Sequence, residues 1–370
     1  MTKVLVVGQI PPPFGGQIMM TKMLLDANYG DIRLFHAPIS FSRGMDEIGK
    51  FRFKKILKLF PLVLNIIYQR FRYGIDILYY TPAGPDLLPM YRDFAILLST
   101  RWLFPRCVFH FHSGGGSTNY HRLGKIGRFL FRRTYFHVDS AIRLSEFSPR
   151  DGEEYRARSN IIIPNGIPDF AKGFIRRSTT PSAKILFVGV VRESKGILIL
   201  LEAASRLAKK NLGYEIRIVG ECESPMFEQC VKNKIQEFHL EDHIHLCGVV
   251  SHEEKLWELY RESNIFCFPT FFESESLPMV LMEAMQFCMP IVTTRWRGIP
   301  SLIEEEVSGF MVPIQDSIAI ANKLEILINN PEKTQQMGQR GRELFLEKYS
   351  INKYHESMGN LFRQVAGERS

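Results

Sequence analysis

Two glutamates with seven residues between them stand out in the segment 271–285, which reads FFESESLPMVLMEAM. Glu275 lies in a short polar stretch, and Glu283 lies in an apolar stretch with the pattern of a helix. Carboxylates accept hydrogen bonds from neighbouring hydroxyls, and a helix N-terminus binds phosphate. The pair therefore predicts a site for a polyol that carries phosphate. The alternative is that Glu283 is only a capping or ion-paired residue of a buried helix.

The residues between the glutamates predict where this helix begins. Proline favours the first helical turn and serine favours the N-cap, so we expect Pro278 and Ser276 in those positions. Backbone amides of the following turn would then face the phosphate of a ligand. The segment expected to bind that phosphate consists of Ser276, Leu277, Pro278, Met279 and Val280.

Two cations follow another predicted strand, in the sequence GVVRESKG at 189–196. Arg192 and Lys195 lie in the loop that leads into the next predicted helix. A diphosphate is bound well by cations close to helix-terminal amides. We therefore expect both side chains to contact it, with plain surface solvation as the alternative for each.

The N-terminal half offers Gly15, Gly16 and His112. The first predicted strand is followed by GQIPPPFGGQ, which lacks the Gly-x-Gly-x-x-Gly pattern of dinucleotide-binding dehydrogenases. The paired glycines let a phosphate approach the backbone, although a tight turn explains them equally well. His112 directly follows the predicted strand at 107–111.

Composition and charge limit the class of protein. The chain has 370 residues, 45% of them hydrophobic and 23% charged, which suits two soluble α/β domains. Residues 1–170 contain 23 Lys and Arg against 13 Asp and Glu, whereas residues 171–370 contain 24 against 26. The basic half predicts an anionic partner: a membrane surface, a nucleic acid or a phosphorylated substrate. No aromatic and basic recognition motif supports nucleic acid.

Several features favour a cytoplasmic location. The start MTKVLVVG reads as a strand rather than a signal peptide, and no apolar run is long enough to cross a bilayer. The six cysteines include no Cys-x-x-Cys pair, so we expect reduced thiols and no zinc. There is no Asp-x-Asp, so we expect neither a metal nor another cofactor.

Short apolar runs alternate with helical patterns twice along the chain. The runs predict strands at 4–7, 75–80, 107–111, 141–144 and 161–163, then at 184–189, 215–219, 244–247, 265–268 and 290–293. Helices are expected at 16–26, 50–72, 86–102 and 121–136, then at 196–210, 225–238, 252–261, 278–287 and 316–328. This rhythm predicts two Rossmann-like, doubly wound domains facing each other across a cleft.

The boundary falls in a turn-rich segment, PNGIPD at 164–169. We expect an N-terminal domain at 1–170 and a C-terminal domain at 171–353. A last helix, at about 354–370, is expected to return to the first domain.

These motifs together resemble retaining glycosyltransferase family 4, whose members have the two-Rossmann fold called GT-B. The resemblance covers nearly the whole chain. It rests on the glutamate pair and on PFGG at 13–16, HFHSGG at 110–115, PNGI at 164–167, KG at 195–196, PIV at 290–292, GIP at 298–300 and SGFMVP at 308–313. Two positions depart from the family pattern. Val190 replaces an arginine, for which Arg192 is a possible substitute, and Ser301 replaces an acidic residue.

The resemblance implies a role for each candidate residue. Glu283 would hold the donor ribose, Glu275 would lie by the transferred sugar, and Lys195 would contact the diphosphate. Gly16 would approach the donor phosphates. His112 would lie beside the sugar, and His112 and Glu275 would be the catalytic residues. For His112 a structural imidazole is the alternative, and His110 is the other inward-facing candidate. The C-terminal domain would bind the nucleotide-sugar, such as a UDP-sugar, and the N-terminal domain the acceptor.

The segment 50–72 predicts where such an enzyme meets a membrane. A helix here places Phe53, Ile56, Leu57, Phe60, Leu64, Ile67 and Phe71 on one stripe, largely opposite Lys50, Lys54, Lys55 and Lys58. The alternative is that the stripe packs on the sheet of its own domain. A second basic run at 122–133 also favours a membrane surface.

We therefore expect a retaining glycosyltransferase, peripheral on the inner face of the cell membrane. It would transfer sugar to a saccharide or lipid-linked acceptor in polysaccharide, lipopolysaccharide or glycolipid synthesis. The alternatives are a GT-B epimerase or phosphorylase and a non-catalytic, membrane-associated protein that binds nucleotide-sugar.

Overall fold

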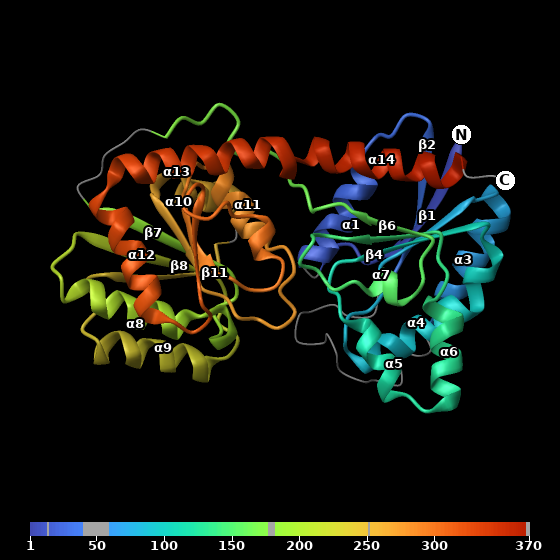
Figure 1. Cartoon of the computed structure of the whole chain (residues 1–370), viewed down its shortest axis with the longest axis horizontal. Coiled ribbons are helices and arrows are strands. Elements are labelled where there is room, and N and C mark those ends of the chain that lie inside the picture. The colour runs from blue at the N-terminus through green and yellow to red at the C-terminus, as the bar shows by residue number, and fades with distance from the viewer. Residues whose placement is uncertain (13–14, 40–58, 177–181, 251, 368–370) are drawn as a thin grey trace. The chain divides into compact units, whose positions relative to one another are not determined.

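The computed structural model describes residues 1–12, 15–39, 59–176, 182–250 and 252–367 (Figure 1). The chain divides into two compact units: unit 1 is Met1–Ile167 with the residues from Ile351 onward, and unit 2 is Pro168–Ser350. Each unit contains a six-stranded sheet whose neighbouring strands are parallel. The predicted α/β fold with two doubly wound sheets is confirmed.

The sheet of unit 1 has the strand order β2-β1-β3-β4-β5-β6. Helices cover both of its faces, so its central strands are almost wholly apolar, and Val4 to Val7 are 0% exposed. The strands are β1 (Thr2–Gly8), β2 (Ile32–Pro38), β3 (Ile77–Tyr80), β4 (Arg106–Phe111), β5 (Ser140–Arg143) and β6 (Ser159–Ile162). The edge strand β2 was not predicted, because its sequence IRLFHAP is only partly apolar and partly buried.

Unit 1 has one helical layer on each side of its sheet. The helices are α1 (Gly16–Asp26), α3 (Leu59–Tyr73), α4 (Leu87–Thr100), α5 (Asn119–Arg122), α6 (Lys125–Tyr135), α7 (Asp151–Glu154) and α14 (Ile351–Gly367). One layer has α3 packed against α4 and α4 against α6, and the other has α1 and α14 against β1. Figure 1 shows α4 and α6 across the sheet from α14.

The last helix, α14, belongs to unit 1 although the preceding 183 residues, Pro168–Ser350, form unit 2. Its buried side chains include Phe362, whose ring meets that of Tyr79 edge-on at 6.0 Å. At its outer edge, Arg363 forms an ion pair of 2.9 Å with Asp31. Apolar burial, supported by this exposed ion pair, holds the helix on the sheet.

The sheet of unit 2 has the order β12-β11-β10-β7-β8-β9. Its strands are β7 (Ala183–Val188), β8 (Tyr214–Val219), β9 (Ile244–Gly248), β10 (Ile265–Phe268), β11 (Ile291–Thr294) and β12 (Gly309–Val312). Its helices are α8 (Ile197–Ala208), α9 (Pro225–Glu237), α10 (Glu253–Glu262), α11 (Met279–Gln286), α12 (Ser317–Asn329) and α13 (Pro331–Leu344). Because β7, β10 and β11 are neighbours, the loops after them emerge side by side.

Two helix predictions need correction or restriction. The helix expected at 121–136 is two helices, α5 and α6, because the chain is extended at Leu123 and Gly124. Of the helix expected at 50–72, α3 describes the part from Leu59, with Pro61 in its first turn, where proline is tolerated. Phe53, Ile56 and Leu57, and the lysines 50, 54, 55 and 58, lie outside the described residues.

Candidate active site

Three loops of unit 2 are hydrogen-bonded to one another at the carboxyl ends of β7, β10 and β11. The amide of Phe271 donates to the carbonyl of Ser194, at 2.8 Å, and joins the loops after β10 and β7. The indole N–H of Trp296 donates to the carbonyl of Phe272, at 2.8 Å, and joins the loop after β11. The residues on these loops are therefore held in place by hydrogen bonds to backbone carbonyls before any ligand binds.

Lys195 and Glu275 form an ion pair between two of these loops. The Lys195 ammonium donates to Glu275 Oε2, and the Thr270 hydroxyl donates to the same oxygen at 3.0 Å. The two side chains are only 14% and 10% exposed. The structure thus brings together the predicted phosphate-binding cation and the predicted catalytic carboxylate, 80 residues apart in sequence.

Arg192 reaches the same cluster through the ring of Phe272. The Arg192 guanidinium carbon lies 5.0 Å from the centre of this ring, and the Lys195 ammonium lies 4.9 Å from it. Arg192 also pairs with Glu223, at 3.3 Å. Both cations therefore gather at one aromatic side chain, which attracts them through its negative face.

Gly196 allows the loop that carries Lys195 to approach the next loop closely. Its φ is +79°, and a Cβ atom built on it would lie 2.1 Å from the carbonyl oxygen of Pro269. Any other residue would force the loops after β7 and β10 apart. The Lys-Gly pair thus has a steric explanation beside the electrostatic one.

Glu283 lies one turn into α11 and is held by Tyr260 of α10. The Tyr260 hydroxyl donates to Glu283 Oε2 at 2.7 Å, and the Tyr260 side chain is fully buried. Burial raises the pKa of Glu283 above its ordinary value, and the hydrogen bond from Tyr260 opposes that rise. Tyr260 therefore favours the ionised form and fixes one carboxylate oxygen.

The start of α11 differs from the prediction. The helix begins at Met279, with Pro278 as the N-cap in extended conformation, so Ser276 is not the cap. The carbonyl of Pro278 accepts from the amide of Leu281 at 3.2 Å. The first amides of a helix have no acceptor inside it, so those of Met279 and Val280 remain suited to a phosphate. Leu277 is buried and anchors the loop instead.

His112 of unit 1 directly follows β4 and is 7% exposed. Its ring stacks on that of His110 at 4.1 Å, and His110 Nδ1 is 2.7 Å from the hydroxyl of Tyr79. Neither ring nitrogen of His112 has a hydrogen-bond partner among the described residues. Burial lowers the pKa of His112 to about 4 and that of His110 well below its ordinary value, so both rings are neutral near pH 7.

The glycine pair of unit 1 begins α1, with Gly15 as an extended N-cap and Gly16 as the first helical residue. A Cβ atom on Gly15 would meet only Ile18, at an ordinary 3.8 Å, so packing alone does not require this glycine. The loop after His112 is held differently. The Asp151 carboxylate accepts from the amides of Gly115, at 2.6 Å, and Ser117, at 2.8 Å.

Residues 172–344 match the protein-family profile described as "Glycosyl transferases group 1". These residues form a group 1 glycosyltransferase domain.

Curated relatives and a solved structure support this assignment. An uncharacterized glycosyltransferase of Haemophilus influenzae is 30% identical over 232 residues, or 62% of this chain and 62% of the relative. WcaL of Escherichia coli K12, named a putative colanic acid biosynthesis glycosyltransferase, is 31% identical over 155 residues, or 40% and 37%. The chain thus matches less than two thirds of the length of either relative.

The structure of HepE from Anabaena in complex with UDP aligns with a TM-score of 0.73 at 16% identity. The alignment covers 98% of this chain and 100% of HepE. A likeness of this extent shows the two-domain GT-B fold.

The group 1 domain contains five of the predicted site features: Arg192, Lys195, Glu275, Glu283 and the start of α11. Arg192, Lys195 and Glu275 cluster around Phe272, whereas Glu283 is hydrogen-bonded to Tyr260 and is not hydrogen-bonded to this cluster. The prediction missed Thr270, Phe272 and Tyr260. Thr270 and Phe272 follow the end of β10, and this position after a predicted strand is the sequence signal that could have identified them.

The described residues contain no group of three or more His, Cys, Asp or Glu side chains arranged to hold a metal ion. Over the same residues, no helix combines the length and apolarity needed to cross a bilayer. All six cysteines are free thiols.

Proposed function

We propose that the chain is a retaining, metal-independent glycosyltransferase of family 4 that uses a nucleotide-sugar donor. The observation that carries this proposal is the Lys195–Glu275 pair held between two loops beside the start of α11. A cation, a carboxylate and helix-terminal amides are the groups that a sugar diphosphate needs. The group 1 match over residues 172–344 supports the same chemistry.

Each residue has a role in this proposal. Unit 2 binds the donor: Glu283 accepts hydrogen bonds from the ribose hydroxyls, and Lys195, Arg192 and the amides of Met279 and Val280 bind the diphosphate. Glu275 lies by the transferred sugar. Unit 1 binds the acceptor, and it supplies His112 to the sugar and Gly15 and Gly16 to the donor phosphates. HepE holds UDP in its structure, which makes a UDP-sugar the donor to test first.

The reaction follows from these roles. The bond between the anomeric carbon and the diphosphate oxygen breaks, and an acceptor hydroxyl forms its bond on the same face of the sugar. The proton of that hydroxyl passes to the leaving phosphate. Lys195 and the helix-terminal amides stabilise the negative charge that develops on the diphosphate. A neutral His112 can exchange hydrogen bonds with sugar hydroxyls without adding a charge near the cationic transition state.

The biological setting in this proposal is the synthesis of a cell-surface polysaccharide, lipopolysaccharide or glycolipid. WcaL, named for colanic acid synthesis, supports it. The acceptor is then a saccharide or a lipid-linked saccharide at the cytoplasmic side of the membrane. The excess of basic residues in 1–170 suits an anionic acceptor or membrane surface.

The proposal is tested in two steps. The pure protein is first screened by thermal shift against UDP-, GDP- and ADP-sugars, and the stabilising donor is then supplied with saccharide acceptors. NMR of the fresh product should show the anomeric configuration of the donor. An inverted product would overturn retention. Products formed with water or phosphate alone would instead indicate an epimerase or phosphorylase, and binding without turnover a non-catalytic protein.

A further inference from the structure

The outer surface of the α3, α4 and α6 layer in unit 1 is unusually apolar. Of the fifteen large hydrophobic side chains exposed among the described residues of unit 1, eleven lie on these helices or on the turn Arg101–Leu103 after α4. None lies on α1 or α14, across the sheet. The most exposed of the eleven are Ile126 at 78%, Trp102 at 75%, Phe60 at 69%, Phe71 at 67%, Tyr68 at 60% and Phe129 at 58%.

The stripe predicted on α3 is part of this surface. Phe60, Leu64 and Phe71 are 69%, 49% and 67% exposed, and Ile67 is half-buried, whereas the side chains that α3 buries are Leu62 and Ile66. Most of the described stripe therefore faces away from the sheet of its own domain.

Basic residues accompany the apolar ones, and acids are nearly absent. Segments 59–73, 87–103 and 119–136 contain nine Lys and Arg and a single acidic residue, Asp93. Asp93 is fully buried and accepts hydrogen bonds from Tyr80 and Tyr135. An exposed acid, Asp86, precedes α4. By contrast, α1 and α14 contain three Lys and Arg and two acids. The large excess of positive charge therefore lies in one of the two helical layers.

Some of these cations stabilise the fold. Arg101 donates to the carbonyls of Thr134, at 2.9 Å, and Phe136, at 2.6 Å, and so satisfies the end of α6. Arg132 donates to the hydroxyl of Tyr120 at 2.7 Å. Their presence needs no partner outside the chain.

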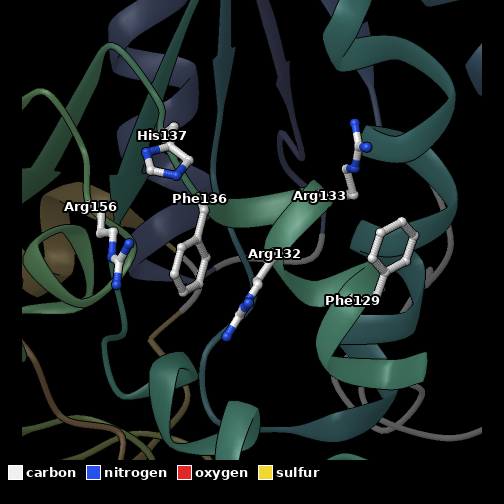
Figure 2. Close-up of a pocket in the computed structure, with 6 residues that line it drawn as sticks. All are labelled: Phe129, Arg132, Arg133, Phe136, His137 and Arg156. Carbon is white, nitrogen blue, oxygen red and sulfur yellow. The ribbon is translucent and has the colours of Figure 1, made fainter. Parts of the chain in front are cut away.

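Three other cations have no such structural role. The side chains of Arg122, Lys125 and Arg133 are exposed and form no hydrogen bond or ion pair with a described residue. Arg133 instead lies 5.5 Å from the centre of the exposed Phe129 ring. Figure 2 shows this pair on α6 beside a hollow of about 490 Å³ that Arg132, Phe136, His137 and Arg156 also line.

We propose that this outer surface of the α3, α4 and α6 layer docks on an anionic lipid bilayer, with Trp102, Ile126 and Phe129 inserted at the headgroup level and Arg122, Lys125 and Arg133 on the lipid phosphates. Exposed aromatic and aliphatic side chains mixed with Lys and Arg on helices parallel to a surface are typical of interfacial membrane binding. The three helices also carry positive charge and no exposed acid, which is complementary to the negative surface of a bilayer that contains anionic lipid. The biological role of this docking rests on the proposed acceptor at the membrane. Binding to vesicles, however, is measured without donor or acceptor. Failure of docking and failure of transfer are therefore distinguishable.

The first test is sedimentation of the full chain with vesicles of phosphatidylcholine, with and without phosphatidylglycerol. The wild type is expected to sediment with the anionic vesicles, and added salt should release it. Each basic residue near an anionic surface contributes roughly a fivefold gain in partitioning. The variant Arg122→Gln, Lys125→Gln, Arg133→Gln should therefore lose about 100-fold. The control Lys22→Gln, Lys353→Gln, Lys209→Gln removes the same charge from other surfaces and should bind like the wild type.

The apolar part is tested by tryptophan fluorescence. Vesicles should shift the emission of the wild type to the blue. Trp102→Phe should abolish most of that shift, because Trp257 is buried and Trp296 is half-buried in unit 2, where its indole N–H is bound to Phe272. The variant Ile126→Ser, Phe129→Ser should bind vesicles less tightly while its thermal unfolding stays unchanged, since both side chains are exposed. Equal sedimentation of the charge variant and its control would overturn the proposal. A dimer of the wild type that Ile126→Ser, Phe129→Ser dissociates would overturn it too, because a second copy would then cover this surface.

Discussion

Tyr260→Phe tests the assignment of Glu283 without touching the proposed ligand. The substitution removes one hydroxyl, which donates to Glu283 Oε2 at 2.7 Å from a fully buried side chain. The ring remains, so its stacking on Phe266 and Phe287, at 5.9 and 5.4 Å, is preserved. The change therefore acts on the carboxylate and not on the packing of α10.

The size of the effect follows from the charge of Glu283. A hydrogen bond to a charged group contributes about 1.5–3 kcal/mol. Without it, burial raises the pKa of Glu283 unopposed, and less of the carboxylate is ionised at neutral pH. Donor affinity should fall about tenfold or more, and the loss should shrink as the pH rises because the ionised form returns.

Calorimetry of donor binding to the wild type, Tyr260→Phe, Glu283→Gln and the double variant separates an effect through the Glu283 carboxylate from a general loss of affinity. Glu283→Gln alone should lose affinity by about 1.5–3 kcal/mol. Tyr260→Phe should add little in the Glu283→Gln background, because the hydroxyl acts through the carboxylate. Additive losses, or an unchanged affinity in Tyr260→Phe, would refute the assignment.

Three further predictions concern Lys195, the absence of a metal requirement and the protonation of His112. Lys195→Ala should weaken donor binding or turnover by about tenfold or more with the fold intact, and a wild-type rate would mean that Arg192 or no cation binds the diphosphate. Transfer should survive EDTA, and a loss that manganese or magnesium restores would contradict metal independence. The buried His112, with a pKa of about 4 against about 6.5 unfolded, makes the unfolded state bind more protons in acid. The free energy of unfolding should thus be undiminished above about pH 6.5 and fall by about 3 kcal/mol towards pH 4. His112→Gln should flatten that fall in pH-dependent denaturation.

The elements predicted best from the sequence are the strands that are apolar along their whole length. The strands around Val4–Val7 and Cys107–Phe111 are buried on both faces, so composition alone reveals them. The edge strand β2 has one neighbour, and its mixture of Arg33, Phe35 and His36 gives no clear period. The alternation of strands and helices still predicted two parallel sheets, because a few missed elements do not change that rhythm.

The site was predicted as residues but not as contacts. Lys195 and Glu275 were each identified from local context, yet their ion pair joins loops 80 residues apart and depends on β7 lying next to β10. The role of Tyr260 depends on how α10 packs against α11, which no local pattern reveals. Ser276 was placed at the helix cap by residue preference. The loop instead turns at Pro278, because Leu277 is buried and Glu275 is held by Lys195 and Thr270.

The pairing of Lys195 with Glu275 also explains how a nearly buried cation can serve an incoming diphosphate. A charge with so little exposure is costly to leave unpaired. Glu275 provides that pairing in the free protein, just as Glu223 does for Arg192. When a diphosphate takes over Lys195, Glu275 Oε2 keeps the hydrogen bond from Thr270 and regains one acceptor position for a sugar hydroxyl. Under the proposed function, binding of the phosphate therefore releases an acceptor position on the sugar-binding carboxylate.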